Sequence, residues 1–89
     1  MLDFDYLLNQ YRTLWNNRAL IVEENSETTL IEAIKRELLD ENSHPRVRKN
    51  VHEKFYLAIK RISTSTLSKE DKLTIISLYI QVLEQITSK

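Results

Sequence analysis

The stretch HPRVRKNVHEKFYLAIKR, residues 44–61, divides this sequence of 89 residues into two parts. It holds the only proline, both histidines and six of the thirteen basic residues. The residue before a proline avoids helical geometry, whereas proline itself suits the first position of a helix. We therefore expect one helix to end before His44 and another to begin at Pro45.

The apolar residues after Pro45 recur at the spacing of one helical face, which indicates a long amphipathic helix. They are Val47, Val51, Phe55, Ala58, Ile59 and Ile62. An earlier stripe of the same kind, from Phe4 to Trp15, predicts a first helix. A further stripe from Leu30 to Leu39 predicts a second helix that ends near Glu41 or Asn42.

Polar residues stand where these helices should start. Asp3 or Asp5 can accept the free amides of the first helix, and Asn25 with Ser26 can cap the second. The end of the first helix stays open. It could stop at Asn16–Asn17, or it could run to about Glu24, because Ile21 and Val22 continue the apolar stripe.

After the polar interval STST comes Leu67, and then Ser68 with Asp71 approximates a capping box for a fourth helix. This helix is apolar around most of its circumference, so we expect it to be the most buried of the four. Four helices with short linkers predict an all-α fold, an antiparallel up-and-down four-helix bundle. A chain of 89 residues has room for one core, so residues 1–89 should form a single domain.

Two missing residue types exclude several functions. The sequence has no glycine, which phosphate-binding loops, dinucleotide fingerprints and nucleophile elbows require. It has no cysteine, so disulfides, thiolate nucleophiles and cysteine-bound zinc are excluded as well. His44 and His52 are eight residues apart, too far to ligate one metal from one helix face. We predict no enzyme, no cofactor and no metal site.

The first twenty residues lack the basic start and apolar block of a signal peptide. The longest apolar-rich run, residues 73–83, is about half the length that a membrane span requires. We therefore expect a soluble cytoplasmic protein.

Charge is unevenly distributed along the sequence. Residues 1–41 hold 4 basic and 9 acidic residues, residues 42–61 hold 6 and 1, and residues 62–89 hold 3 and 3. The segment charges are therefore −5, +5 and 0. The plain interpretation is that the third helix packs beside the acidic second helix. The sharper one is a basic surface that meets an acidic protein or lipid headgroups, since zero net charge and a pI near 6.7 argue against nucleic acid.

Aromatic and basic side chains often anchor interfaces, and Trp15 and Tyr56 are aromatic candidates for such a role. The full set of candidate partner-binding residues is Arg46, Arg48, Lys49, Tyr56, Lys60 and Lys69.

The sequence as a whole resembles the immunity proteins of pediocin-like (class IIa) bacteriocins, the enterocin A immunity family. The likeness lies in LLNQYRTL, then LIEAIKRELLDENSHPRVRKNVHEKFYLAIKRIS, then LSKEDKLTIISLYIQVLEQ. It consists of a leading leucine-asparagine-tyrosine helix, a proline between the second and third helices, and a leucine-serine start to a helix that carries Leu-Tyr.

The resemblance implies a cytoplasmic four-helix bundle that protects the producing cell from its own bacteriocin. Such proteins engage the membrane receptor, the mannose phosphotransferase permease, once bacteriocin is bound. The family's C-terminal half governs which bacteriocin is resisted, which here points to the third helix, residues 63–68 and the end after Leu83. Many relatives carry a further C-terminal segment that is not seen after Lys89.

Two other functions remain open from the residues alone. One is a small helical adaptor or regulator that binds a soluble partner or itself through apolar surface. The other is a helical DNA-associated regulator, which would need a steeply salt-dependent affinity for duplex.

Overall fold

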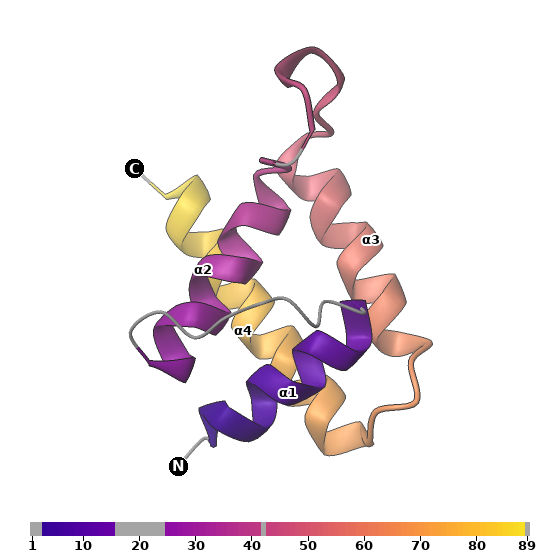
Figure 1. Cartoon of the computed structure of the whole chain (residues 1–89). Coiled ribbons are helices and arrows are strands. Elements are labelled where there is room, and N and C mark those ends of the chain that lie inside the picture. The colour runs from indigo at the N-terminus through magenta and orange to yellow at the C-terminus, as the bar shows by residue number, and fades with distance from the viewer. Residues whose placement is uncertain (1–2, 16–24, 42, 89) are drawn as a thin grey trace.

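The residues that the structure describes form four α-helices (Figure 1). The computed structural model describes residues 3–15, 25–41 and 43–88. Within these ranges the predicted all-α four-helix bundle is confirmed. The elements are α1 (Phe4–Trp15), α2 (Ser26–Leu38), the short 3-10 helix η1 (Pro45–Val47), α3 (Val51–Ser63) and α4 (Lys69–Thr87).

Each α-helix begins at a polar side chain that accepts the backbone amide three residues on, which satisfies one of the free donors of the first turn. The predicted caps Asn25 and Ser68 are confirmed, and Asp3 rather than Asp5 caps α1. The pairs, with the accepting side chain first and the donating amide second, are Asp3–Tyr6 (3.1 Å), Asn25–Thr28 (2.8 Å), Asn50–Glu53 (2.8 Å) and Ser68–Asp71 (3.1 Å).

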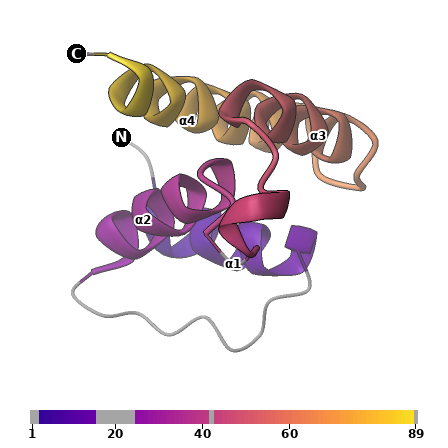
Figure 2. The ribbon, with the colours of Figure 1, turned by 90° about the horizontal axis from the view of Figure 1, so that it is seen from above.

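The helices lie in two layers, α1 with α2 and α3 with α4 (Figure 2). α3 and α4 run antiparallel and are joined by residues 64–68. α2 contacts each of the other three helices, and α1 also contacts α4. Contacts of α2 with α3 and α4, and of α1 with α4, therefore join the two layers.

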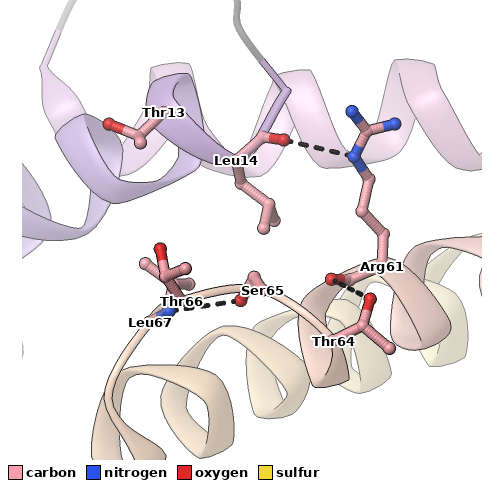
Figure 3. A pocket seen from close by; sticks show the side chains of 7 residues that line it. All are labelled: Thr13, Leu14, Arg61, Thr64, Ser65, Thr66 and Leu67. Atoms are coloured by element: carbon pink, nitrogen blue, oxygen red, sulfur yellow. Dashed lines mark hydrogen bonds between the residues drawn. The ribbon is translucent and has the colours of Figure 1, made fainter.

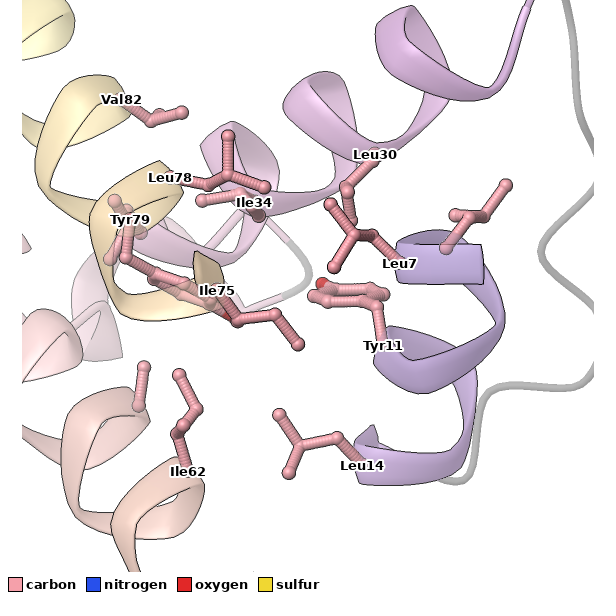
Figure 4. Packing of buried hydrophobic residues seen from close by; sticks show 13 residues of the cluster. Leu7, Tyr11, Leu14, Leu30, Ile34, Ile62, Ile75, Leu78, Tyr79 and Val82 are labelled. Carbon is pink, nitrogen blue, oxygen red and sulfur yellow. The ribbon is translucent and has the colours of Figure 1, made fainter. Parts of the chain in front are cut away.

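One apolar core fills the space between the layers, and all four helices contribute to it (Figure 4). Tyr11, Ile34, Ile62 and Ile75 come from four different helices and point toward the same region. The buried apolar residues are Leu7, Leu8, Tyr11, Leu14, Leu30, Ile34, Leu38, Ala58, Ile62, Ile75, Leu78, Tyr79 and Val82. Those of α1, α2 and α3 fall on the predicted stripes. In α4, which is apolar on most sides in the sequence, periodicity did not single out the buried residues Ile75, Leu78 and Val82.

The predicted boundaries around the proline were wrong. α2 ends at Leu38 rather than near Glu41, and α3 begins at Val51 rather than at Pro45. Pro45 opens a single 3-10 turn, after which the backbone is extended at Arg48 and Asn50. Val47, which matched the apolar stripe, is 69% exposed as a result.

The prediction that the fourth helix is the most buried was also wrong. α4 buries one face, as α1 and α2 do, while Leu73 is 66% and Ile80 43% exposed. The other layer covers only one side of the α3–α4 layer, so apolar residues on the outer side of α4 face solvent (Figure 2).

The two alternatives for the end of the first helix concern residues 16–24, which lie outside the described ranges. The side chain of Trp15 is likewise not described.

None of the described helices is long and apolar enough to cross a membrane.

Candidate functional site

The connection between α2 and α3 projects from one end of the bundle (Figure 1). We call its described residues, 39–41 and 43–50, the basic loop. It contains three of the six candidate residues, Arg46, Arg48 and Lys49. Its conformation decides which of these side chains can reach a partner.

The basic loop begins with a left-handed residue, Asp40, at φ 54°. The Asp40 amide donates to the carbonyl of Glu37 (3.0 Å), and the Glu41 amide donates to that of Arg36 (3.1 Å). These two bonds form a Schellman motif, which ends a helix at a residue that is usually glycine. In this glycine-free sequence an aspartate takes that position, which Asp tolerates better than most residues.

The side chain of Asp40 then organises the loop. Its carboxylate accepts hydrogen bonds from the Ser43 hydroxyl (3.0 Å) and the Lys49 amide (3.0 Å). It also pairs with the Lys54 ammonium of α3 at 3.6 Å. The Lys49 amide is the main cause of a lowered pKa of Asp40, and Ser43 and Lys54 lower that pKa further against the opposing effect of burial. The ionised carboxylate therefore joins the end of α2 to the start of α3.

Arg48 closes the loop from the other side. Its Nε donates to the carbonyl of Ser43 (3.1 Å) and its Nη2 to the carbonyl of Glu41 (3.4 Å). The ring of His44 accepts the Arg46 amide at Nδ1 (3.2 Å). Bonds within the loop thus hold its backbone on both sides of Pro45, and the Arg48 guanidinium is directed at that backbone.

Residues 44–50 are all exposed, and Arg46, Val47 and Lys49 are among them. Of the large apolar side chains in the described ranges, Val47 is the most exposed, at 69%. A fixed loop on a helical scaffold that presents a small set of exposed side chains is a common form of binding site.

The other three candidate residues lie elsewhere. Tyr56 and Lys60 are exposed and one turn apart on α3. Lys69 is the first residue of α4, at the end of the α3–α4 layer opposite the basic loop (Figure 1). The structure therefore brings together Arg46, Arg48 and Lys49 but does not gather all six candidates into one patch.

The plain interpretation of the charge asymmetry accounts for part of it. α2 and α3 are neighbours, and Lys54 of α3 pairs with Asp40 after α2. Arg61 of α3 instead donates from Nε to the Leu14 carbonyl of α1 (3.2 Å). Packing therefore uses Lys54 and Arg61, whereas Arg46 and Lys49 lie on the exposed loop.

A model of the YoyC family matches residues 2–89. The chain belongs to the YoyC family. The protein YoyC of Bacillus subtilis (strain 168), described as uncharacterized, is 39% identical over 78 residues. That match spans 88% of this chain and 83% of the relative. No solved structure matches the chain significantly.

The YoyC-family chain also contains a polar cluster inside the bundle that the sequence analysis missed. Glu37 of α2 accepts hydrogen bonds from the hydroxyls of Tyr79 on α4 (2.5 Å) and Tyr11 on α1 (3.4 Å). The available signal was the position of Glu37 between Ile34 and Leu38 on an apolar stripe. A carboxylate there must find donors, and tyrosines on facing stripes supply them.

Burial sets the protonation behaviour of this cluster. It raises the pKa of Glu37. Four groups oppose that rise, in decreasing order of effect: the Tyr79 hydroxyl, the charge of Lys54, the Tyr11 hydroxyl and the charge of Arg61. Burial and the nearby Glu37 charge also raise the pKa of Tyr11. These groups join three helices within the core, which is a structural role.

A hollow of about 300 Å³ lies between the end of α1 and the α3–α4 connection (Figure 3). Its polar groups serve the fold: the Thr64 hydroxyl donates to the Arg61 carbonyl (3.3 Å) and the Ser65 hydroxyl accepts the Leu67 amide (3.4 Å). The described residues include no group of three or more side chains that could hold a metal ion. The basic loop is the stronger candidate site.

Proposed function

We propose that this chain is a binding protein that protects its cell from a pediocin-like bacteriocin. In this proposal it docks, from the cytoplasmic side, on the mannose phosphotransferase permease that bacteriocin has occupied. The resemblance of the sequence supports the immunity role. The observation that carries the docking site is the basic loop, whose backbone is fixed and whose Arg46, Val47 and Lys49 face outward.

The fixed conformation favours binding because little chain entropy remains to be lost when the loop meets a partner. Asp40 and Arg48 each tie two separate parts of the loop together. Arg46 and Lys49 then supply positive charge that can steer the chain toward an acidic surface. The proposed activity needs neither a catalytic group nor a cofactor.

The first test is to express the chain in a bacterium sensitive to pediocin-like bacteriocins and to score survival against a panel of them, with an empty vector as control. Selective survival against one or a few would support the immunity role. Uniform sensitivity, with the protein shown by immunoblot to be present and by circular dichroism to be folded, would overturn it.

Matched charge reversals then test the docking site. Arg46→Glu with Lys49→Glu should abolish protection, because both side chains face outward from the loop. Lys60→Glu with Lys69→Glu changes the net charge equally at exposed positions away from the loop and should retain protection. Loss of protection in the second pair alone would move the docking surface to α3 and the start of α4.

A second candidate function, an adaptor that binds a soluble helical partner or a second copy, has its own observation. Leu73, Ile76, Ile80 and Leu83 follow a 3-4-3 spacing along α4, which places them on one side of the helix. Leu73 and Ile80 are exposed, and the other two are partly buried. A mass in solution that rises with concentration and falls to monomer in Leu73→Glu/Ile80→Glu would favour this function.

A further inference from the structure

The tip of the basic loop combines features that fit an anionic membrane surface. We infer that residues 44–49 bind the headgroups of anionic phospholipids, with Val47 entering the interface between headgroups and acyl chains. The inference rests on the proposed function only in taking the basic loop as the docking element. It adds the chemical class of surface that this loop contacts.

The charge of the tip is of one sign. Residues 44–49 carry three basic side chains and no carboxylate. Of the two carboxylates earlier in the loop, Asp40 is turned toward Ser43, Lys49 N–H and Lys54, and Glu41 is exposed. A basic side chain close to an anionic lipid surface contributes roughly fivefold in affinity.

The apolar side chain at the centre of this charge distinguishes a lipid surface from other anionic partners. Val47 lies between Arg46 and Arg48 in the sequence and is 69% exposed. A lone exposed apolar residue is ordinary on a protein surface. An apolar side chain flanked by cations on a projecting tip, however, matches an interface that offers phosphates above hydrocarbon. Duplex phosphates offer no such apolar layer.

The rest of the molecule favours one orientation at such a surface. Among the described residues, 3–15 and 25–41 hold 3 basic and 7 acidic side chains, a net charge of −4, and residues 43–61 hold 6 and 1, a net charge of +5. The basic loop projects from one end of the bundle (Figure 1). An anionic surface should therefore attract the loop and repel the acidic segment, which presents the tip first.

The experiment is co-sedimentation of the full chain with vesicles of phosphatidylcholine, with and without phosphatidylglycerol. We expect binding only to the vesicles that contain phosphatidylglycerol, and weaker binding as salt rises. Arg46→Gln/Lys49→Gln should lower the partition coefficient roughly 25-fold, and Arg46→Glu/Lys49→Glu should lower it further. Val47→Asp should also lower the partition coefficient, although Arg46 and Lys49 are unchanged in that variant.

Lys60→Glu/Lys69→Glu is the matched control and should bind as the unchanged protein does. Equal loss of binding in this control would overturn the inference, because net charge rather than the loop would then govern attraction. Equal binding to vesicles without phosphatidylglycerol, or tighter binding to a DNA duplex than to vesicles, would overturn it too. Circular dichroism of each variant checks that the helices are intact.

Vesicles contain neither permease nor bacteriocin, so this test and the survival test can fail separately. Survival without vesicle binding would overturn the lipid inference and leave the immunity proposal standing, with a protein surface as the contact of the loop. Vesicle binding with uniform bacteriocin sensitivity would overturn the immunity proposal and support the lipid inference.

Discussion

Glu37 and Asp40 lie three residues apart at the end of α2, and their surroundings change their acidity in opposite directions. Glu37 turns into the bundle, where burial raises its pKa and two tyrosine hydroxyls hydrogen-bond it. Asp40 lies at the base of the basic loop, where the Lys49 amide and its other donors lower its pKa. At Asp40 one backbone amide, a serine hydroxyl and a lysine outweigh the effect of burial, whereas at Glu37 the tyrosine hydroxyls do not.

The difference separates two kinds of stability in this fold. The Glu37 cluster joins α1, α2 and α4 and should contribute to global unfolding. The Asp40 cluster joins residues of one connection and should govern local opening of the basic loop. Four experiments test whether the two clusters differ in this way.

The largest effect is expected at Tyr79, which is fully buried and donates to Glu37. Tyr79→Ala should lower the free energy of unfolding by about 3 to 5 kcal/mol, because it creates a cavity in the core. Tyr79→Phe keeps the ring, removes the hydroxyl and should cost roughly 1 to 2 kcal/mol. Denaturant unfolding of both variants measures the two contributions, and equal losses would show that the ring contributes nothing beyond its hydroxyl.

The next effect is expected at Asp40 and should be local. Asp40→Ala removes the acceptor of the Lys49 amide and places alanine at a positive φ. We expect exchange of the Lys49 amide hydrogen to accelerate on the order of tenfold or more, measured by NMR. Asp40→Asn, which tolerates the same φ and keeps an acceptor, should accelerate it less. Unchanged exchange in Asp40→Ala would mean that Arg48 alone holds the loop.

The pH dependence of stability should distinguish the two carboxylates. The pKa of Glu37 is raised in the folded state, so as pH falls its carboxyl is protonated in the folded state before it is protonated in the unfolded state. The free energy of unfolding should therefore increase as pH falls from neutral through the folded pKa. The folded pKa of Asp40 is lowered, so its contribution is present above its ordinary pKa and is lost as pH falls through the folded value. Unfolding free energies at a series of pH values measure both. Glu37→Gln should remove the gain in stability at falling pH, and Asp40→Asn should remove the loss.

The smallest effect is expected at Lys54, whose charge lowers the pKa of both carboxylates. Lys54→Gln should raise both pKa values, measured by carbon-13 NMR of the carboxyl groups, while its cost to stability stays below about 1 kcal/mol. Lys72→Gln, at another basic position on a different helix, serves as the control. A shift confined to Asp40 would show that Lys54 does not act on the core cluster.

Much of the fold could be predicted because local rules and packing agree. Asn25 and Ser68 are caps by residue type and position, and the apolar spacing of α1 and α2 selects the residues that are buried. The rules failed at residues 44–50, where Val47 has helical spacing relative to Val51 but lies before the start of α3. Spacing cannot reveal the left-handed Asp40 and the bonds of Arg48 that turn this segment into a loop.

The candidate site was predicted as a charge pattern and not as a surface. Arg46 and Arg48 look equivalent in the sequence, yet the Arg48 guanidinium bonds the loop backbone and Arg46 is one of the outward-facing residues. How the loop closes decides which arginine bonds the loop backbone and which one faces outward. The residue type alone does not determine how the loop closes. Lys60 and Lys69 were grouped with them by charge although they lie elsewhere.

The hydrogen bonds and the ion pair described for the basic loop join residues that are near each other in the sequence. They include the Ser43–Asp40 hydrogen bond and the Lys54–Asp40 ion pair. Closing a loop of about ten residues takes roughly 10 to 100 ns, far less than assembling a bundle. The end of α2, the loop and the start of α3 can therefore form early during folding, before α4 has been packed. A newly made chain would thus have a shaped loop while its core was still incomplete.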